Sequence, residues 1–128
     1  MNPSKLLVIF SMAALVSSCG KKKSGDFSVS ASLTGLADQK AIIEEIHFTG
    51  KNPTEILDTT DVKGGKFAFS VKAMDEGLYR IRFENENSFL FVINDESEIK
   101  IGGNFDAHQI QTESFNTPAN KELKSFIQ

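Results

Sequence analysis

The 128-residue sequence predicts an all-β fold, an antiparallel β-sandwich or barrel-like domain of about seven or eight short strands with one helix at its C-terminal end. Three observations support this prediction. Several short segments alternate apolar and polar residues with the period of two that is typical of a half-buried strand. Turn-forming residues separate these segments. Ten of the eleven phenylalanines lie in residues 26–128, and phenylalanine is enriched in strands.

The first predicted strand is residues 27–33, FSVSASL, in which apolar residues at odd positions alternate with serines. The alternation returns in residues 66–72, and the "KGG" before them favours a tight turn with glycine at positive φ. We therefore expect a hairpin there, with residues 56–62 as its first arm. Residues 42–48 form another predicted strand, with Glu45 and His47 on one face and three apolar residues on the other: Ile42, Ile46 and Phe48.

Two further strands are predicted in the second half of the chain. Residues 78–84 place Tyr79, Ile81 and Phe83 on one face and Arg80, Arg82 and Glu84 on the other. Residues 88–93, SFLFVI, are almost wholly apolar, which predicts a strand that is covered on both faces. Shorter strands are expected at residues 98–101 and 109–112. The connections are too short for crossover helices, so we expect antiparallel pairing.

The periodicity becomes helical only at the end of the chain. Thr117 is a suitable N-cap residue and Pro118 suits the first helical position. Leu123, Phe126 and Ile127 then follow at helical spacing and form an apolar stripe that needs cover. We expect residues 117–128 to be the start of a helical connector to a further domain.

The N-terminal segment predicts a lipoprotein signal. An apolar run of eleven residues reaches only about 16 Å as a helix, about half of a hydrocarbon core. A permanent membrane span is therefore not expected. The tetrad Val16-Ser17-Ser18-Cys19 resembles the bacterial lipobox, which implies cleavage between Ser18 and Cys19 and a diacylglycerol thioether on Cys19. The alternative is an ordinary signal peptide with a chance cysteine. The expected organisation is a signal peptide (1–18), a lipidated polar tether (19–25), a β domain (26–116) and the connector (117–128).

Charge and cysteine content argue against two classes of function. Residues 26–128 contain ten basic and seventeen acidic side chains, a net charge of −7, which disfavours nucleic acid as a partner. Lys21 to Lys23 are interpreted as part of a solvated tether, with contact to a membrane surface as the alternative. The single cysteine leaves no Cys-x-x-Cys motif, so we do not expect this chain by itself to be a thiol oxidoreductase.

The candidate polar sites have structural explanations that we prefer. His47 and His108 are far apart in sequence and lack a third metal ligand. We interpret Asp95, Glu96 and Glu98 as a solvated acidic turn rather than a calcium site. We therefore predict no metal site and no cofactor.

The two arginines of the predicted strand 78–84 are a further candidate. Arg80 and Arg82 are expected to pair with cross-strand carboxylates, or alternatively to hold an anionic ligand. Glu44 and Glu45 point to opposite faces of one strand and cannot act together as an acid/base pair. No catalytic residue is predicted, and two remaining acidic residues are interpreted as turn and strand-edge groups: Asp58 and Asp61.

The order of these segments resembles a known family, domain of unknown function 4369. This is the small β domain that opens many Bacteroidetes envelope lipoproteins, usually before a thioredoxin-like domain of the AhpC/TSA or TlpA type. The most specific segments are "DTTDVKGGKFAFS" and the helix start Asn120-Lys121-Glu122-Leu123. Gly64 stands where the family often has aspartate, and both residues suit a turn. The resemblance implies a thioredoxin-like domain after the helix, of which these 128 residues contain nothing.

The resemblance implies a non-catalytic N-terminal accessory domain of a membrane-anchored thiol-disulfide oxidoreductase, serving as a spacer or partner-binding module. The alternative is a stand-alone envelope lipoprotein whose β-sandwich binds a glycan, peptide or protein. By analogy with other bacterial lipoproteins, Gly20 and the lysines after Cys19 imply a position in the outer membrane, facing the periplasm. The expected partners are the membrane, through the lipid on Cys19, and a thioredoxin-like domain or its substrates.

Overall fold

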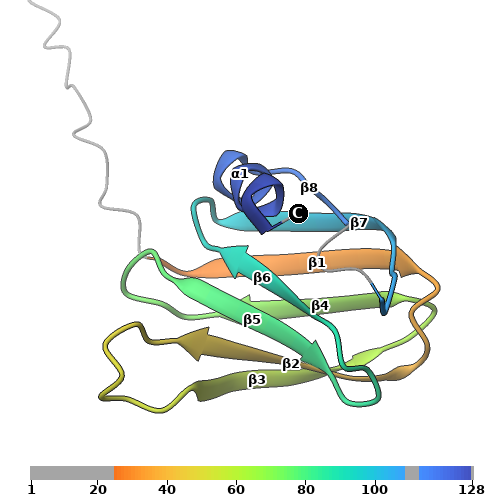
Figure 1. Cartoon of the computed structure of the whole chain (residues 1–128), viewed down its shortest axis with the longest axis horizontal. Helices are drawn as coiled ribbons and strands as arrows, with labels where there is room; N and C mark the ends of the chain where they lie inside the picture. The colour runs from red at the N-terminus through yellow and green to blue at the C-terminus, as the bar shows by residue number, and fades with distance from the viewer. Residues whose placement is uncertain (1–24, 109–112, 128) are drawn as a thin grey trace, which may run out of the picture.

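The computed structural model describes residues 25–108 and 113–127. In this part of the chain two four-stranded sheets pack face to face, and a helix lies along one edge of the sandwich (Figure 1). This confirms the predicted all-β fold with a C-terminal helix. The elements are β1 (Phe27–Thr34), β2 (Gln39–Ile46), β3 (Glu55–Val62), β4 (Lys66–Val71), β5 (Leu78–Phe83), β6 (Phe89–Ile93), β7 (Glu98–Asn104), β8 (Ser114–Phe115) and α1 (Pro118–Ile127).

The strand order is β4-β1-β7-β8 in one sheet and β3-β2-β5-β6 in the other. Neighbouring strands are antiparallel, as expected, except that β1 and β7 pair in parallel, with Val29 opposite Ile99. The parallel pair is possible because most of the chain between β1 and β7 builds the opposite sheet before β7 returns. The strand predicted at residues 109–112 falls outside the described residues. No helix within those residues is long and apolar enough to cross a bilayer.

The core lies between the sheets and is made by the inward residues of both. Phe67 of β4 packs edge-on against Phe83 of β5, with ring centroids 5.6 Å apart, and so joins the two sheets. Phe27 of β1 and Tyr79 of β5 make a second aromatic contact between the sheets, with tilted rings whose centroids are 4.7 Å apart. Burial of Tyr79, with the charge of Glu45 adding a smaller effect, raises the pKa of the phenol to about 12. The remaining fully buried core side chains are mainly aliphatic: Val29, Leu33, Ile43, Val62, Ile81, Leu90, Val92 and Ile99.

The "KGG" segment forms the expected tight turn but not the expected hairpin. Gly64 and Gly65 have φ values of 58° and 74°, and Lys63 and Lys66 exchange two backbone hydrogen bonds of 3.0 Å. Beyond this single bridge the strands diverge, because β3 belongs to one sheet and β4 to the other. A Cβ atom on Gly65 would lie 2.0 Å from the carbonyl oxygen of Leu33, so the turn is pressed against the end of β1. The turn is a corner between the sheets.

One prediction about strand faces was wrong. Strand β6 is not covered on both faces: Leu90 and Val92 are buried, whereas Phe89, Phe91 and Ile93 are half-buried on the side away from the core. On strand β2, Ile42 and Ile46 share one face as predicted, and this face points outward because Ala41 and Ile43 face the core. Strand β5 behaves as predicted, with its two arginines on the outward face. The sheet β3-β2-β5-β6 therefore has apolar residues on both sides.

Helix α1 begins at the predicted residues and is attached to the edge of β6 by one side chain. The Oδ1 atom of Asn120 accepts a hydrogen bond of 2.7 Å from the backbone nitrogen of Ile93, and its Nδ2 atom donates to the carbonyl oxygen of Ile93 at 2.8 Å. The amide of Asn120 thus takes the place of a strand partner. Asp95 accepts a 3.0 Å hydrogen bond from the backbone nitrogen of Ala119 and caps the helix N-terminus.

Candidate functional site

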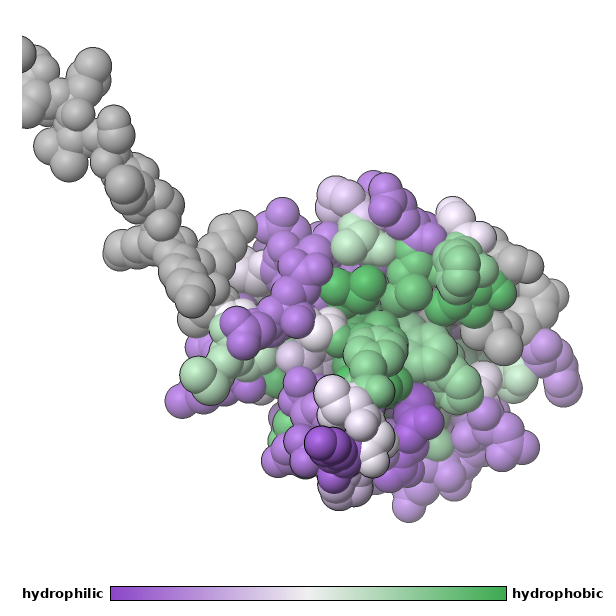
Figure 2. Space-filling view, turned by 60° about the vertical axis from the view of Figure 1, so that its left-hand side comes forward, coloured by the Kyte–Doolittle hydropathy of each residue, from purple (hydrophilic) through white to green (hydrophobic). Residues whose placement is uncertain are grey.

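The outward face of the sheet β3-β2-β5-β6, called here the outer face, is the most unusual surface of the domain. Solvated sheet faces normally carry polar side chains. This one carries half-buried apolar side chains from three strands, and Figure 2 shows a broad green area on this part of the molecule. Phe89 and Phe91 pack edge-on with ring centroids 5.1 Å apart. The half-buried apolar residues of the outer face are Ile42, Ile46, Leu78, Phe89, Phe91 and Ile93.

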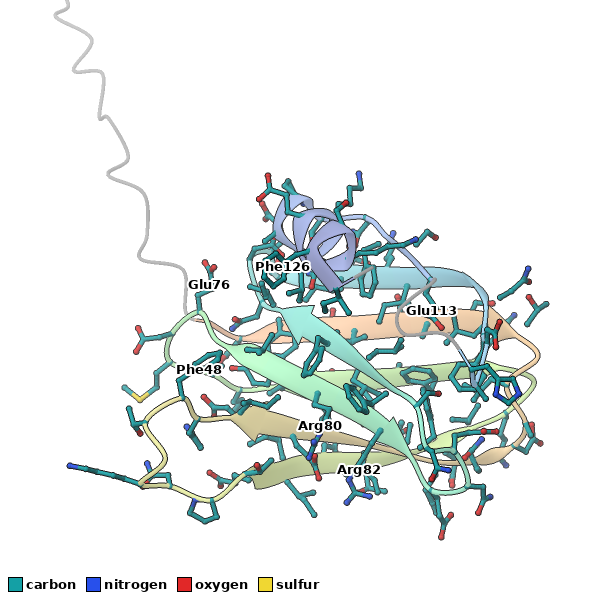
Figure 3. All side chains as sticks on the ribbon, in the orientation of Figure 1. Phe48, Glu76, Arg80, Arg82, Glu113 and Phe126 are labelled. Atoms are coloured by element: carbon teal, nitrogen blue, oxygen red, sulfur yellow. The ribbon has the colours of Figure 1, made fainter. Side chains whose placement is uncertain are left out.

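An ion cluster of three residues lies among these apolar side chains. Arg80 donates from Nε and Nη2 to Oε2 of Glu44, at 2.9 and 2.7 Å. Arg82 donates from Nε to Oε1 of Glu44 at 2.6 Å. The register explains this contact, because Glu44 on β2 is directly opposite Arg80 on β5. The cross-strand pairing predicted for the two arginines is therefore confirmed, and Figure 3 shows both on the outer face.

The ion cluster keeps Glu44 ionised and leaves one positive charge in excess. Burial favours a higher pKa for Glu44, but hydrogen bonds from Arg82 and Arg80 and their charges outweigh it and hold the pKa below its usual range. Both carboxylate oxygens are engaged, so Glu44 is a weak base and suits a structural role. The side chain of Arg82 stays 38% exposed, and its terminal nitrogens have no acceptor among the described residues. They are available to an anionic group of a partner.

A shallow apolar groove of about 330 Å³ lies at the end of the outer face nearest the helix. Its sides come from β5, β6, the loop after β2, and α1, which is held there by Asn120. Phe48 and Phe126 are 81% and 89% exposed, although such large apolar side chains are usually buried. Both are labelled in Figure 3. The groove is lined by Phe48, Glu76, Gly77, Leu78, Ile93 and Leu123.

The lipidation residues predicted from the sequence, Ser18 and Cys19, lie outside the described residues. His47 is the first residue of the loop after β2, and His108 lies in the loop after β7, where its backbone nitrogen donates a hydrogen bond to Asp106. In residues 25–108 and 113–127 no three His, Cys, Asp or Glu side chains are grouped so as to hold a metal ion.

The other acidic candidates are now accounted for by contacts within the fold. Of the acidic turn, Asp95 caps α1 and is therefore not simply solvated. Asp61 forms an ion pair with Lys40 of the neighbouring strand, and the hydrogen bond and charge of Lys40 lower the pKa of Asp61. Asp58 accepts a hydrogen bond from the backbone nitrogen of Thr59. These contacts fit the predicted roles of Asp58 and Asp61 as strand-edge groups.

Sequence reasoning missed Glu113, which is only 1% exposed (Figure 3). Its Oε2 atom has no hydrogen-bond partner among the described residues. Burial raises the pKa of Glu113; a hydrogen bond from its own backbone and the charge of Lys124 oppose this effect, and the charge of Asp106 adds to it. The sequence offers one indication of this burial. Glu113 lies two residues before Phe115, so the alternation of β8 places both side chains on the inward side.

One side of this β-sandwich therefore combines an apolar outer face, an ion cluster with two arginines and a shallow apolar groove. The chain belongs to the family described as domain of unknown function (DUF4369), whose model matches residues 27–123. This confirms the resemblance stated from the sequence. No curated protein and no solved structure matches the chain.

Proposed function

We propose that this chain is a non-catalytic accessory domain of an envelope protein, tied to the membrane by a lipid on Cys19, and that a separate thioredoxin-like domain carries out thiol-disulfide chemistry. The observation that carries the proposal is the outer face. A contiguous exposed apolar patch larger than those of typical soluble monomers indicates a contact surface. In the ion cluster on this face, both carboxylate oxygens of Glu44 are engaged by arginines, which hold Glu44 as a weak base. Such a face suits binding rather than bond-breaking.

The anchor defines how far the domain extends from the membrane. Residues 19–25 link the lipidated cysteine to strand β1, which begins at Phe27. The eight residue steps from Cys19 to Phe27 span at most about 29 Å when fully extended. The sandwich would therefore stay within about one domain diameter of the bilayer, at the outer membrane and facing the periplasm. The groove and outer face would then be presented to partners that reach this surface.

The accessory role is tested by determining which polypeptide carries this domain in the cell. An antiserum against residues 25–127 should detect a band clearly heavier than the 14.1 kDa of these 128 residues. Immunoprecipitated material should reduce insulin in a dithiol-dependent reaction. A band no heavier than 14.1 kDa, with no thiol activity, would refute the accessory role. That result would favour a stand-alone envelope lipoprotein that uses the groove to bind a glycan, peptide or protein.

The anchor is tested separately with Cys19→Ala. The variant should lose labelling by a radioactive fatty acid and accumulate as uncleaved precursor, because the acylated thiol is the group that the lipoprotein signal peptidase requires. Ser17→Ala is the matched control, since alanine is also a small residue and should preserve labelling. Undiminished labelling of Cys19→Ala would contradict the anchor without bearing on the role of the sandwich.

A further inference from the structure

The groove and the helix beside it form one continuous patch that contains both a depression and a projection. Leu78, Ile93 and Leu123 line the depression. The projection is Phe126, 89% exposed on the same helix that supplies Leu123 (Figure 3). An interface with two-fold symmetry requires the same patch on both molecules to be complementary to itself. A patch that combines a groove with an exposed aromatic side chain meets this requirement.

The charges on this patch are also complementary at the right spacing. Glu122 and Phe126 are both exposed and lie one helical turn apart on α1, about 6 Å along the axis. On β5, Leu78 of the groove and Arg80 of the ion cluster lie on the same face, two residues or about 6.6 Å apart. A helix that places Phe126 in the groove of a second molecule can therefore bring Glu122 over Arg80. This contact pairs an acidic side chain with the excess positive charge of the ion cluster.

We propose that the patch is a homodimer interface, in which Phe126 of each copy enters the groove of the other. A second copy is favoured over an unrelated partner because one chain supplies both halves of the contact, the aromatic residue with its carboxylate and the groove with its arginine. The domain is otherwise strongly acidic, so two copies repel each other over most of their surfaces. Arg80 and Arg82, the only arginines in the chain, lie on the outer face. Arginine and aromatic residues are both enriched at protein interfaces.

Thiol cross-linking of the full-length protein in intact cells tests the proposal. Ser125→Cys places a thiol on the exposed side of α1 next to Phe126, and a bismaleimide should then link two chains. Lys66→Cys, on a strand of the other sheet, is the positional control and should remain monomeric. The wild type, with Cys19 alone, gives the background. A wild-type cross-link would indicate a free Cys19 thiol, which bears on the anchor, and the interface would then be measured as the increase above that background.

A second substitution in the Ser125→Cys background tests whether the cross-linked dimer forms through this patch. Phe126→Asp should weaken self-association by about 30-fold or more, the scale of a central interface residue, and so remove the cross-linked dimer. Its side chain is already solvated, so the fold should persist. Met74→Asp is the matched control, because Met74 is 90% exposed and does not line the groove. Glu122→Lys should reduce the dimer partially.

Three results would overturn the proposal: no product above background, a dimer that survives Phe126→Asp, or a product whose mass shows a different protein joined to this chain. A product that contains a different protein would identify a heterologous partner. Absence of any product would indicate that the lipid surface or another domain covers the patch.

Discussion

Replacement of Asn120 by alanine should destabilise the domain far more than its place on a short terminal helix implies. Asn120 is fully buried. Its Oδ1 atom accepts from the nitrogen of Ile93 at 2.7 Å, and its Nδ2 atom lies 2.8 Å from the oxygen of Ile93 and 2.7 Å from Oγ1 of Thr117. Alanine removes all of these bonds at once. It thereby removes the hydrogen bonds through which this side chain attaches α1 to the edge of β6.

The size of the effect follows from the groups left unpaired. Each buried donor or acceptor without a partner costs about 1–3 kcal/mol. Asn120→Ala leaves the nitrogen and the oxygen of Ile93 unpaired, and Ile93 is half-buried, so water can compensate in part. We expect the free energy of unfolding to fall by about 3 kcal/mol. With a urea m-value of about 1–3 kcal/mol per molar, the denaturation midpoint should move down by about 1–3 M.

Asn116→Ala is the matched control for this measurement. Asn116 bonds to a strand edge in the same way, with Oδ1 accepting from the nitrogen of Lys100 at 2.7 Å and Nδ2 donating to the oxygen of Glu98 at 3.2 Å. It is solvent-exposed, however, so water can replace the amide and the cost should stay below about 1 kcal/mol. Equal effects of the two substitutions, or an Asn120→Ala effect below about 1 kcal/mol, would refute the reasoning.

Three further predictions concern the core, a turn and a buried acid. Phe69→Ala, in the core, should lower the free energy of unfolding by about 3–5 kcal/mol, whereas Phe91→Ala, on the outer face, should cost clearly less in the same urea titration. Gly65→Ala should destabilise more than Gly64→Ala, because both have positive φ but only Gly65 meets backbone; equal melting temperatures would contradict this. Because the pKa of Glu113 is raised by burial, the folded chain keeps a proton that the unfolded chain releases, and stability falls as pH rises from the ordinary glutamate range through the raised pKa. Glu113→Gln should therefore raise the melting temperature at neutral pH and lose this advantage in acid; a gain that does not change with pH would exclude titration of Glu113 as its cause.

The sequence predicted the strands well where one face is buried and the other solvated. Phe27 to Leu33 alternate clearly, and β1 lies where the pattern placed it. The same reasoning failed for β6, because a fully apolar segment does not distinguish a strand covered on both sides from one with an exposed apolar face. It could not show that β3 and β4 separate after the turn, since a tight turn determines local direction and not which sheet each strand joins.

The candidate site was predicted only in part. Arg80 and Arg82 were assigned correctly to cross-strand pairs, because alternation places them on one face and the surrounding sequence is rich in carboxylates. A single residue, Glu44, pairs with both arginines because of the register between β2 and β5. The alternation of the sequence does not specify this register. Asn120 had a usable signal: it shares the inward helical face with Leu123 and Ile127, where a polar residue requires a partner. Its partner, Ile93, could come only from the three-dimensional fold.

The position of β1 within its sheet has a consequence for biosynthesis. Strand β1, the first strand in the part of the chain that the structure describes, is a central one, paired with β4 on one side and with β7 on the other. Contacts between residues so far apart in sequence form slowly, because a long loop must close before they stabilise the fold. We expect the nascent chain to remain without a stable sandwich until β7 has been synthesised, which a protease-protection series of chains released at successive lengths would show. In the proposed envelope protein, a sandwich that forms only after β7 has been synthesised would leave the earlier part of the chain unfolded during export.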